Sequence, residues 1–231
     1  MPTLLPDYLV TARSLREYAA MLGLDPAALA GRDVLDCPGG AASFAAEAAA
    51  LGARVTAADP VYALPAGEVA VRALDDTAAG ARGIAAHAER YAWTTFAGPE
   101  EHAAERTAAA ARFAWDLRVS PERYVAAALP DLPFSDGSFD LVLSSHLLFT
   151  YADRLDPAFH VAAARELVRV CRPGGEVRVF PLVPHDPAAY APVAEVRAAL
   201  EADGCVTAVL PVAYRLQRGA YSALVITPPP R

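Results

Sequence analysis

Two aspartates, Asp36 and Asp59, each end a short apolar segment and lie about 23 residues apart. Between them stand a tight turn, Pro38–Gly40, and an alanine-rich stretch of helical character, 41–51. A strand, a glycine turn, a helix and a second strand ending in an acid form a dinucleotide-type βαβ unit, whose second carboxylate accepts hydrogen bonds from ribose hydroxyls. The spacing therefore predicts that Asp59 binds a ribose, the alternative being an aspartate that caps a helix or turn.

The segment Asp36–Ala42, DCPGGAA, resembles the first motif of class I S-adenosylmethionine-dependent methyltransferases, in which an acid precedes a glycine-rich loop (DxGxGxG). Gly40 falls on a family glycine position, whereas Pro38 and Ala42 occupy the other two. Enzymes of this family bind no pyrophosphate at the loop, which need only let the backbone approach the methionine part of the ligand. Gly39 and Gly40 can supply the positive φ or the close approach that this requires.

A second segment, LPDLPFSDGSFDLVLSSHLLFTY (129–151), resembles the family's region around the fourth strand. The resemblance implies that the loop at Leu129 and Pro130 lies along the adenine and that Ser144, at the end of the strand, touches the amino acid part of the cofactor. Ala128 stands where many members carry the acid that binds the adenine amino group, so backbone groups near Leu129 would replace it. The segment CRPGGEVRVF (171–180) is similar to the family's turn into the fifth strand, and the resemblance covers roughly residues 30–62 and 123–227.

Strands that alternate with helices, followed by a closing strand pair, predict an α/β fold with a Rossmann-like, doubly wound, mostly parallel sheet. The resemblance implies seven strands, the last of them antiparallel, in a single methyltransferase-like domain over residues 1–231. The expected strands are 33–36, 54–58, 123–127, 139–144, 176–180, 204–210 and 221–227. The expected helices are 8–22, 41–51, 65–74, 157–170 and 187–202. A helical insertion, 75–121, is expected between strands two and three, in two helical pieces at 75–91 and 99–117. This insertion could form a lid over the substrate.

The N-terminal helix, 8–22, is the element that caps the cofactor in similar methyltransferases, where an arginine or tyrosine on it can reach the methionine carboxylate. Arg13 and Tyr18 are the candidates for this role, the alternative being a core tyrosine and a surface arginine. We assign the role to Tyr18 and favour the surface position for Arg13. Asp36 is expected to order the glycine loop and the cofactor amine rather than to act as an acid or base. The cofactor-binding set that follows is Tyr18, Asp36, Pro38, Gly39, Gly40, Asp59, Leu129, Pro130 and Ser144.

Methyl transfer from a sulfonium asks little of the protein beyond holding the nucleophile in line, excluding water and removing a proton. His146, directly after the fourth strand, is the candidate base, with a packing or capping histidine as an equally weighted alternative. The candidates for contact with the acceptor are Tyr91, Trp93, Tyr151 and His185, although the first two rings could instead pin the insertion to the core. No His–Glu pair has the spacing of a metal site, so no metal is expected.

Composition excludes several classes of protein. The chain contains no lysine, and so it has no P-loop lysine, no lysine for a Schiff base with pyridoxal phosphate and no Tyr-xxx-Lys pair. A net charge of −7 argues against a nucleic-acid substrate. No apolar run is long enough for a membrane span, the N-terminus lacks the pattern of a secretory signal, and the three cysteines are widely spaced, so a cytoplasmic protein is expected.

The resemblance implies an S-adenosylmethionine-dependent methyltransferase that transfers a methyl group to a small-molecule acceptor. One alternative is a nucleotide-cofactor oxidoreductase, which would explain the two acids but not the segment 129–151. The other is a non-catalytic cofactor-binding or scaffold member of the methyltransferase fold, which the altered glycine loop keeps open. The sequence indicates neither the attacking atom of the acceptor nor the oligomeric state.

Overall fold

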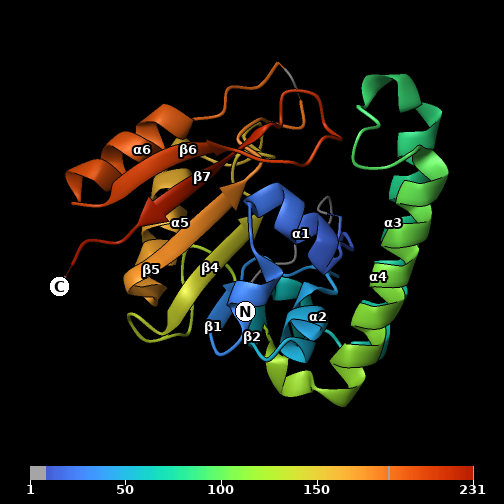
Figure 1. Cartoon of the computed structure of the whole chain (residues 1–231), viewed down its shortest axis with the longest axis horizontal. Helices are drawn as coiled ribbons and strands as arrows, with labels where there is room; N and C mark the ends of the chain where they lie inside the picture. Colours follow the sequence, from blue (N-terminus) through green and yellow to red (C-terminus); the bar gives the residue numbers. More distant parts are fainter. Residues whose placement is uncertain (1–8, 187, 231) are drawn as a thin grey trace.

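One twisted sheet with helices on both faces forms the frame of the molecule (Figure 1). The computed structural model describes residues 9–186 and 188–230. Within these residues the strand order is β3-β2-β1-β4-β5-β7-β6, and β7 runs antiparallel to both of its neighbours while the other pairs are parallel. The strands are β1 Asp33–Asp36, β2 Arg54–Ala58, β3 Tyr124–Val125, β4 Phe139–Ser145, β5 Cys171–Phe180, β6 Val206–Pro211 and β7 Ser222–Thr227. The predicted Rossmann-like, mostly parallel seven-stranded sheet is therefore confirmed.

The helices divide into two layers. They are α1 Leu15–Leu22, α2 Phe44–Ala50, α3 Ala66–Ala86, α4 Pro99–Val119, α5 Pro157–Val170 and α6 Val193–Ala202, with short 3₁₀ turns η1 Pro26–Leu29, η2 Pro60–Ala63, η3 Ala88–Arg90 and η4 Pro121–Arg123. Adjacent residues of β1 show how the layers arise, since Val34 packs into the core beneath α1, α2 and α4 and Leu35 into the core beneath α5 and α6. Strands buried on both faces read as continuous apolar runs, which is why β1 and β4 were visible in the sequence.

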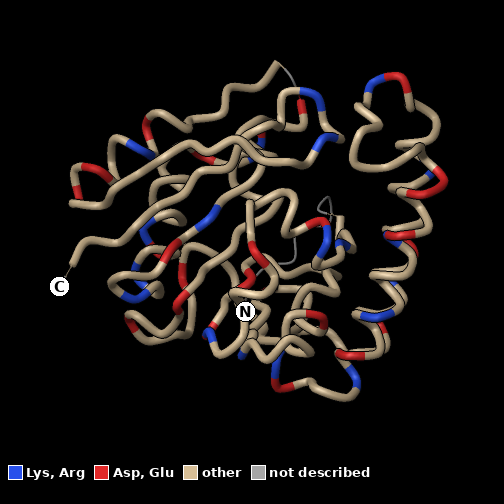
Figure 2. The backbone as a smooth tube through the Cα atoms, viewed as in Figure 1, with Lys and Arg blue, Asp and Glu red and all other residues tan. Residues whose placement is uncertain are grey.

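Helices α3 and α4 pack along each other as a long hairpin beside the sheet (Figure 1). Charged residues of both signs are spaced along the two helices (Figure 2). The prediction of two separate helices, 65–74 and 75–91, was wrong, because α3 runs unbroken to Ala86. Nothing at the expected boundary breaks a helix, and an ion pair of Arg72 with Asp76 at 3.5 Å spans it with i,i+4 spacing. Among the described residues, no helix is both long and apolar enough to cross a membrane.

The N-terminal helix is shorter than the predicted 8–22, whose first residue lies outside the described part. It begins at Leu15 because Ser14 and Glu17 form a capping box, in which each side chain bonds the other residue's backbone N–H at 3.2 and 3.3 Å. The preceding residues, 9–13, are not helical, and we call them the strap. The carbonyls of Thr11 and Arg13 accept hydrogen bonds from the N–H groups of residues 41 and 43, so the strap follows the glycine loop.

Smaller boundary differences have local causes. Helix α6 begins at Val193 rather than at 187, since Pro192 disfavours helical backbone at the residue before it. Helix α2 begins at Phe44 rather than 41, because the loop that precedes it is held by the strap. Strand β5 already pairs with β4 at Cys171, although the register shifts before the regular ladder resumes at Glu176.

Candidate functional site

A cavity of about 1420 Å³ opens at the carboxyl ends of β1, β2 and β4. Its floor comprises the loops 37–40, 58–61, 127–129 and 145–147, and the strap, α3 and α4 supply much of its wall. This is where open α/β sheets bind ligands, in the crevice outside the strand ends at the switch in strand order. The volume exceeds the roughly 300–1,000 Å³ of a pocket for one drug-sized ligand. The cavity therefore has room for two ligands side by side.

The glycine loop keeps its tight geometry despite Pro38 and Ala42. A Cβ built on Gly39 would lie 2.6 Å from Tyr62 Oη and 2.9 Å from Ala57 Cβ, which no side chain tolerates without displacement. Gly40 has a φ of +51°, in the left-handed region that favours glycine. The Tyr62 hydroxyl donates to the Gly40 carbonyl at 2.8 Å. Both glycines thus have a steric reason to be glycine.

Asp59 directly follows β2 and lines the cavity. One carboxylate oxygen accepts from the N–H of Gly40 at 3.0 Å and the other from the N–H of Val61 at 2.9 Å, which caps η2. Burial raises the pKa of Asp59, and these two bonds oppose the rise. Because an ionised carboxylate has about four acceptor sites, two remain for a ligand's hydroxyls. The capping role and a ligand-binding role are therefore compatible in one side chain.

Asp36 differs from the prediction. It is 1% exposed and does not line the cavity, and the hydroxyl of Tyr18 lies 3.1 Å from each of its carboxylate oxygens. Burial raises its pKa well above the ordinary value. The expectation that Asp36 orders the glycine loop was wrong, because it is Asp59 that bonds Gly40. Tyr18 does line the cavity, stacked on Phe44 with ring centres 4.6 Å apart.

The loop after β3 contributes Leu129 to the cavity, whereas Pro130 and Ser144 do not line it. Ser144 is buried within β4, and its hydroxyl has no hydrogen-bond partner among the described residues. Side chains of α5 hold this loop in place. The N–H of Leu132 donates to Glu166 at 2.7 Å, and the carbonyl of Leu132 accepts from Arg169 at 3.1 Å.

His146 stands at the end of β4 and lines the cavity. Its φ of 54° is uncommon for a residue with a side chain and is typical of functional sites. Its N–H donates to the carbonyl of Phe180, and its Nδ1 lies 2.8 Å from Ser145 Oγ. Burial first, then the charges of Arg13 and Arg106, hold its pKa well below the usual range. The imidazole is therefore neutral at physiological pH, and one of its ring nitrogens is an acceptor.

Three of the four residues expected near the acceptor line the cavity: Tyr91, Tyr151 and His185. Trp93 does not. Its indole N–H donates to the carbonyl of Ala88 at 2.8 Å, and its ring meets His102 edge-on at 6.4 Å. Both contacts lie within the insertion, and the ring also packs against the hydrophobic core, as the alternative for this ring proposed.

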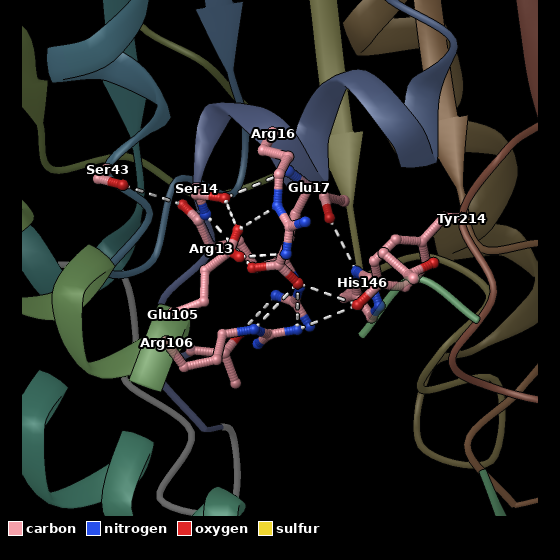
Figure 3. A network of polar contacts seen from close by, with 12 residues as sticks. Arg13, Ser14, Arg16, Glu17, Ser43, Glu105, Arg106, His146 and Tyr214 are labelled. Atoms are coloured by element: carbon pink, nitrogen blue, oxygen red, sulfur yellow. Dashed lines mark hydrogen bonds and ion pairs between the residues drawn. The ribbon is translucent and has the colours of Figure 1, made fainter. Parts of the chain in front are cut away.

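A buried charged cluster beside the cavity was not expected from the sequence. Glu17, with 0% exposure, accepts hydrogen bonds from Tyr214 at 2.9 Å and from Arg106 at 3.0 Å (Figure 3). Arg13, expected at the surface, is 8% exposed and lines the cavity, and burial lowers its pKa to about 10 with a further contribution from Arg106. His102, also on the cavity wall, is 2% exposed, and burial lowers its pKa to about 3. One feature of the sequence bears on the position of Arg13. The Ser14–Glu17 capping box starts the helix at Leu15, so Arg13 lies in the segment before the helix and not on its surface.

A family model described as "Methyltransferase domain" matches residues 76–179. This match and the seven-stranded fold together support a class I S-adenosylmethionine-dependent methyltransferase family. An uncharacterized protein from Methanocaldococcus jannaschii is 28% identical over 182 residues, which are 78% of this chain and 80% of that protein. One from Mycobacterium tuberculosis is 45% identical over 58 residues, 25% of this chain and 19% of that protein. An O-methyltransferase family protein from Burkholderia thailandensis has a similar fold, with a TM-score of 0.50 and 16% identity over 89% of this chain and 53% of that one.

The region matched by the family model runs from within α3 to β5. It includes Leu129 and His146, whereas the glycine loop and Asp59 precede it. Assignments at the loop and at Asp59 therefore rest on their geometry. In the described part of the chain, no group of three or more His, Cys, Asp or Glu side chains could hold a metal ion.

Proposed function

We propose that this protein transfers a methyl group from S-adenosylmethionine to a small-molecule acceptor. The observation that carries the proposal is the single cavity of about 1420 Å³, in which the glycine loop and Asp59 share one space with His146 and Tyr151. When bound, the cofactor supplies a methyl group activated by a positively charged sulfur. The remaining tasks of binding, orientation and proton removal fall to residues that line this cavity.

The residues present fit the cofactor. The backbone of Pro38, Gly39 and Gly40 can approach the methionine part closely, because neither glycine carries a Cβ. Asp59 keeps two acceptor sites for ribose hydroxyls and is already oriented by two backbone bonds. Leu129 offers an apolar surface to the adenine, and the strap closes over the glycine loop.

His146 is the proposed base. If Nδ1–H donates to Ser145 Oγ, the other ring nitrogen is left to accept the proton that the acceptor's hydroxyl, thiol or amine gives up. Tyr91, Tyr151 and His185 supply further contacts for the acceptor, and α3 and α4 wall this side of the cavity, so the insertion acts as the acceptor-binding element. The three cysteines are free and buried, which supports a reducing, cytoplasmic environment.

The test is calorimetric titration with S-adenosylmethionine, with its demethylated product S-adenosylhomocysteine, and with NAD. We expect micromolar binding of the first two and none of NAD. Asp59→Ala should weaken binding of the demethylated product at least tenfold, because two charge-assisted bonds are lost. Asp25→Ala is the matched control, since Asp25 also caps a 3₁₀ turn that starts with proline, but lies outside the cavity.

Failure of the wild-type protein to bind either sulfur compound would overturn the proposal and favour a scaffold member of the fold. Tight binding of NAD would favour an oxidoreductase. Equal affinity in wild type and Asp59→Ala would show that the cofactor does not use the cavity as proposed.

A further inference from the structure

The cavity wall is basic although the chain is acidic. Among the described residues, six of the chain's 20 basic side chains line it, but two of its 27 acidic ones do. The acids are Asp59 and Asp76. The arginines are Arg13, Arg72, Arg90, Arg106, Arg154 and Arg218. A cavity lined with one sign of charge concentrates ligands of the opposite sign.

Unsatisfied buried polar atoms gather at the same wall. Among the described residues, the buried side-chain nitrogen and oxygen atoms without a hydrogen-bond partner include Arg13 Nε, both ring nitrogens of His102, Thr77 Oγ1 and Thr150 Oγ1, and all four residues line the cavity. Each such atom destabilises the protein when nothing replaces its bonds to water. Because all of them line one cavity, a ligand held there could supply the missing partners.

The balance of buried charge points the same way. Arg13 and Arg106 are each 8% exposed, and one buried carboxylate, Glu17, bonds directly to Arg106. Arg13 donates to the hydroxyl of Thr11, and it forms no ion pair within the described residues. A buried charge is costly unless a counter-charge accompanies it. Within the described residues, no carboxylate is in contact with the guanidinium of Arg13, so its buried charge is left without a paired counter-charge.

We propose that the acceptor is an organic anion whose charged group binds Arg13 and His102, while its apolar body lies against Ile84 and Leu216 on the cavity wall. This rests on the proposed function. The cofactor does not account for so basic a wall, since its sulfonium and amine outweigh its single carboxylate and give it a net positive charge. His102 and Thr77 also stand on α4 and α3 rather than on the loops that would hold the cofactor. At neutral pH the uncharged imidazole still donates one N–H to an anionic oxygen.

The test compares benzoate with benzamide, which has the same shape and no charge, by NMR titration of the wild-type protein with and without S-adenosylhomocysteine. We expect benzoate to bind at least about tenfold more tightly, the size of a hydrogen bond to a charged group. Arg13→Gln should abolish this preference while changing the affinity for S-adenosylhomocysteine less than about threefold. Arg16→Gln is the control, because Arg16 is exposed and outside the cavity. Thermal unfolding verifies that each variant is folded.

Equal binding of benzoate and benzamide would overturn the inference. So would a tenfold loss of S-adenosylhomocysteine affinity in Arg13→Gln, which would assign Arg13 to the cofactor's carboxylate. The two proposals fail separately. If S-adenosylhomocysteine binds without a preference for the anion, the methyltransferase proposal survives alone. If the preference is present and S-adenosylhomocysteine does not bind, the anion site stands and the methyltransferase proposal fails.

Discussion

Replacing Glu17 with glutamine removes the carboxylate that accepts hydrogen bonds from both Arg106 and Tyr214. The shape of the side chain is kept, so the change is one of charge. Arg106 then remains buried without its counter-charge, and the nearby guanidinium of Arg13 no longer has the compensating field of Glu17. Breaking a buried ion pair by removing one partner costs roughly 3–5 kcal/mol, far more than the pair's net contribution relative to an apolar pair.

The corresponding change in melting temperature follows from the size of the chain. Unfolding entropy is about 2.1 cal/mol/K per residue, which for 231 residues gives roughly 0.5 kcal/mol/K. We therefore expect Glu17→Gln to lower the melting temperature by about 6–10 °C. Urea unfolding should show the same 3–5 kcal/mol loss as a lower midpoint with an unchanged slope. A double-mutant cycle with Arg106→Gln isolates the coupling between the two side chains.

The matched control is Glu101→Gln, the same substitution on the exposed side of α4, where Glu101 lies 3.5 Å from Arg16. An exposed pair contributes at most about 1 kcal/mol, so this variant should melt near wild type. A loss below about 1 kcal/mol in Glu17→Gln would refute the reasoning, because it would mean that water reaches the cluster and screens its charges.

Two further predictions concern the cavity wall and the glycine loop. The pKa of His102 is about 3 in the folded state against 6.5 for a free imidazole, so below pH 6.5 the unfolded chain binds a proton that the folded chain does not. The free energy of unfolding therefore falls as pH falls from about 6.5 toward 3. In urea titrations, His102→Gln should remove roughly 2 kcal/mol of the loss that wild type shows between about pH 7 and pH 5. An identical loss in the variant would contradict this. Gly39→Ala should weaken S-adenosylhomocysteine binding at least tenfold, since the new methyl would meet Tyr62 and Ala57. Gly80→Ala adds a methyl in open space within α3, so it should raise the free energy of unfolding by about 1 kcal/mol through helix propensity. Unchanged affinity in Gly39→Ala would show that the loop can shift at little cost.

The fold was predictable because the strands of a parallel sheet and their flanking turns depend on short, contiguous sequence patterns. The bounds 33–36 and 54–58 were correct, as was the helix 157–170, whose Asp156–Pro157 start is a strong capping signal. The long α3 was divided wrongly because alanine, glycine and acid residues at its middle lack a strong apolar period. What decides its continuity is packing against α4, which the sequence does not display.

The candidate site was predictable in its location and less so in its contacts. The carboxyl ends of β1, β2 and β4 do meet at one cavity, as strand order dictates. Asp59, rather than Asp36, bonds the glycine loop, whereas the carboxylate of Asp36 contacts the hydroxyl of Tyr18 from α1. The placement of Arg13 and His102 depends on burial by distant segments, and burial of a charged residue is a tertiary property that composition and periodicity do not encode.

The Glu17 cluster also constrains when the binding site can form. The three side chains that meet there are contributed by positions 17, 106 and 214, and the first and the last are 197 positions apart in the sequence. During synthesis the carboxylate leaves the ribosome long before either partner exists, so α1 cannot settle into its final place until the segment after β6 has been made. Contacts of such large sequence separation carry a high closure entropy and form late. The sheet is itself completed only by β7, which follows Tyr214 in the chain, so a nascent chain should acquire both its full sheet and its closed cavity late, and ligand binding is a late event in the maturation of the protein.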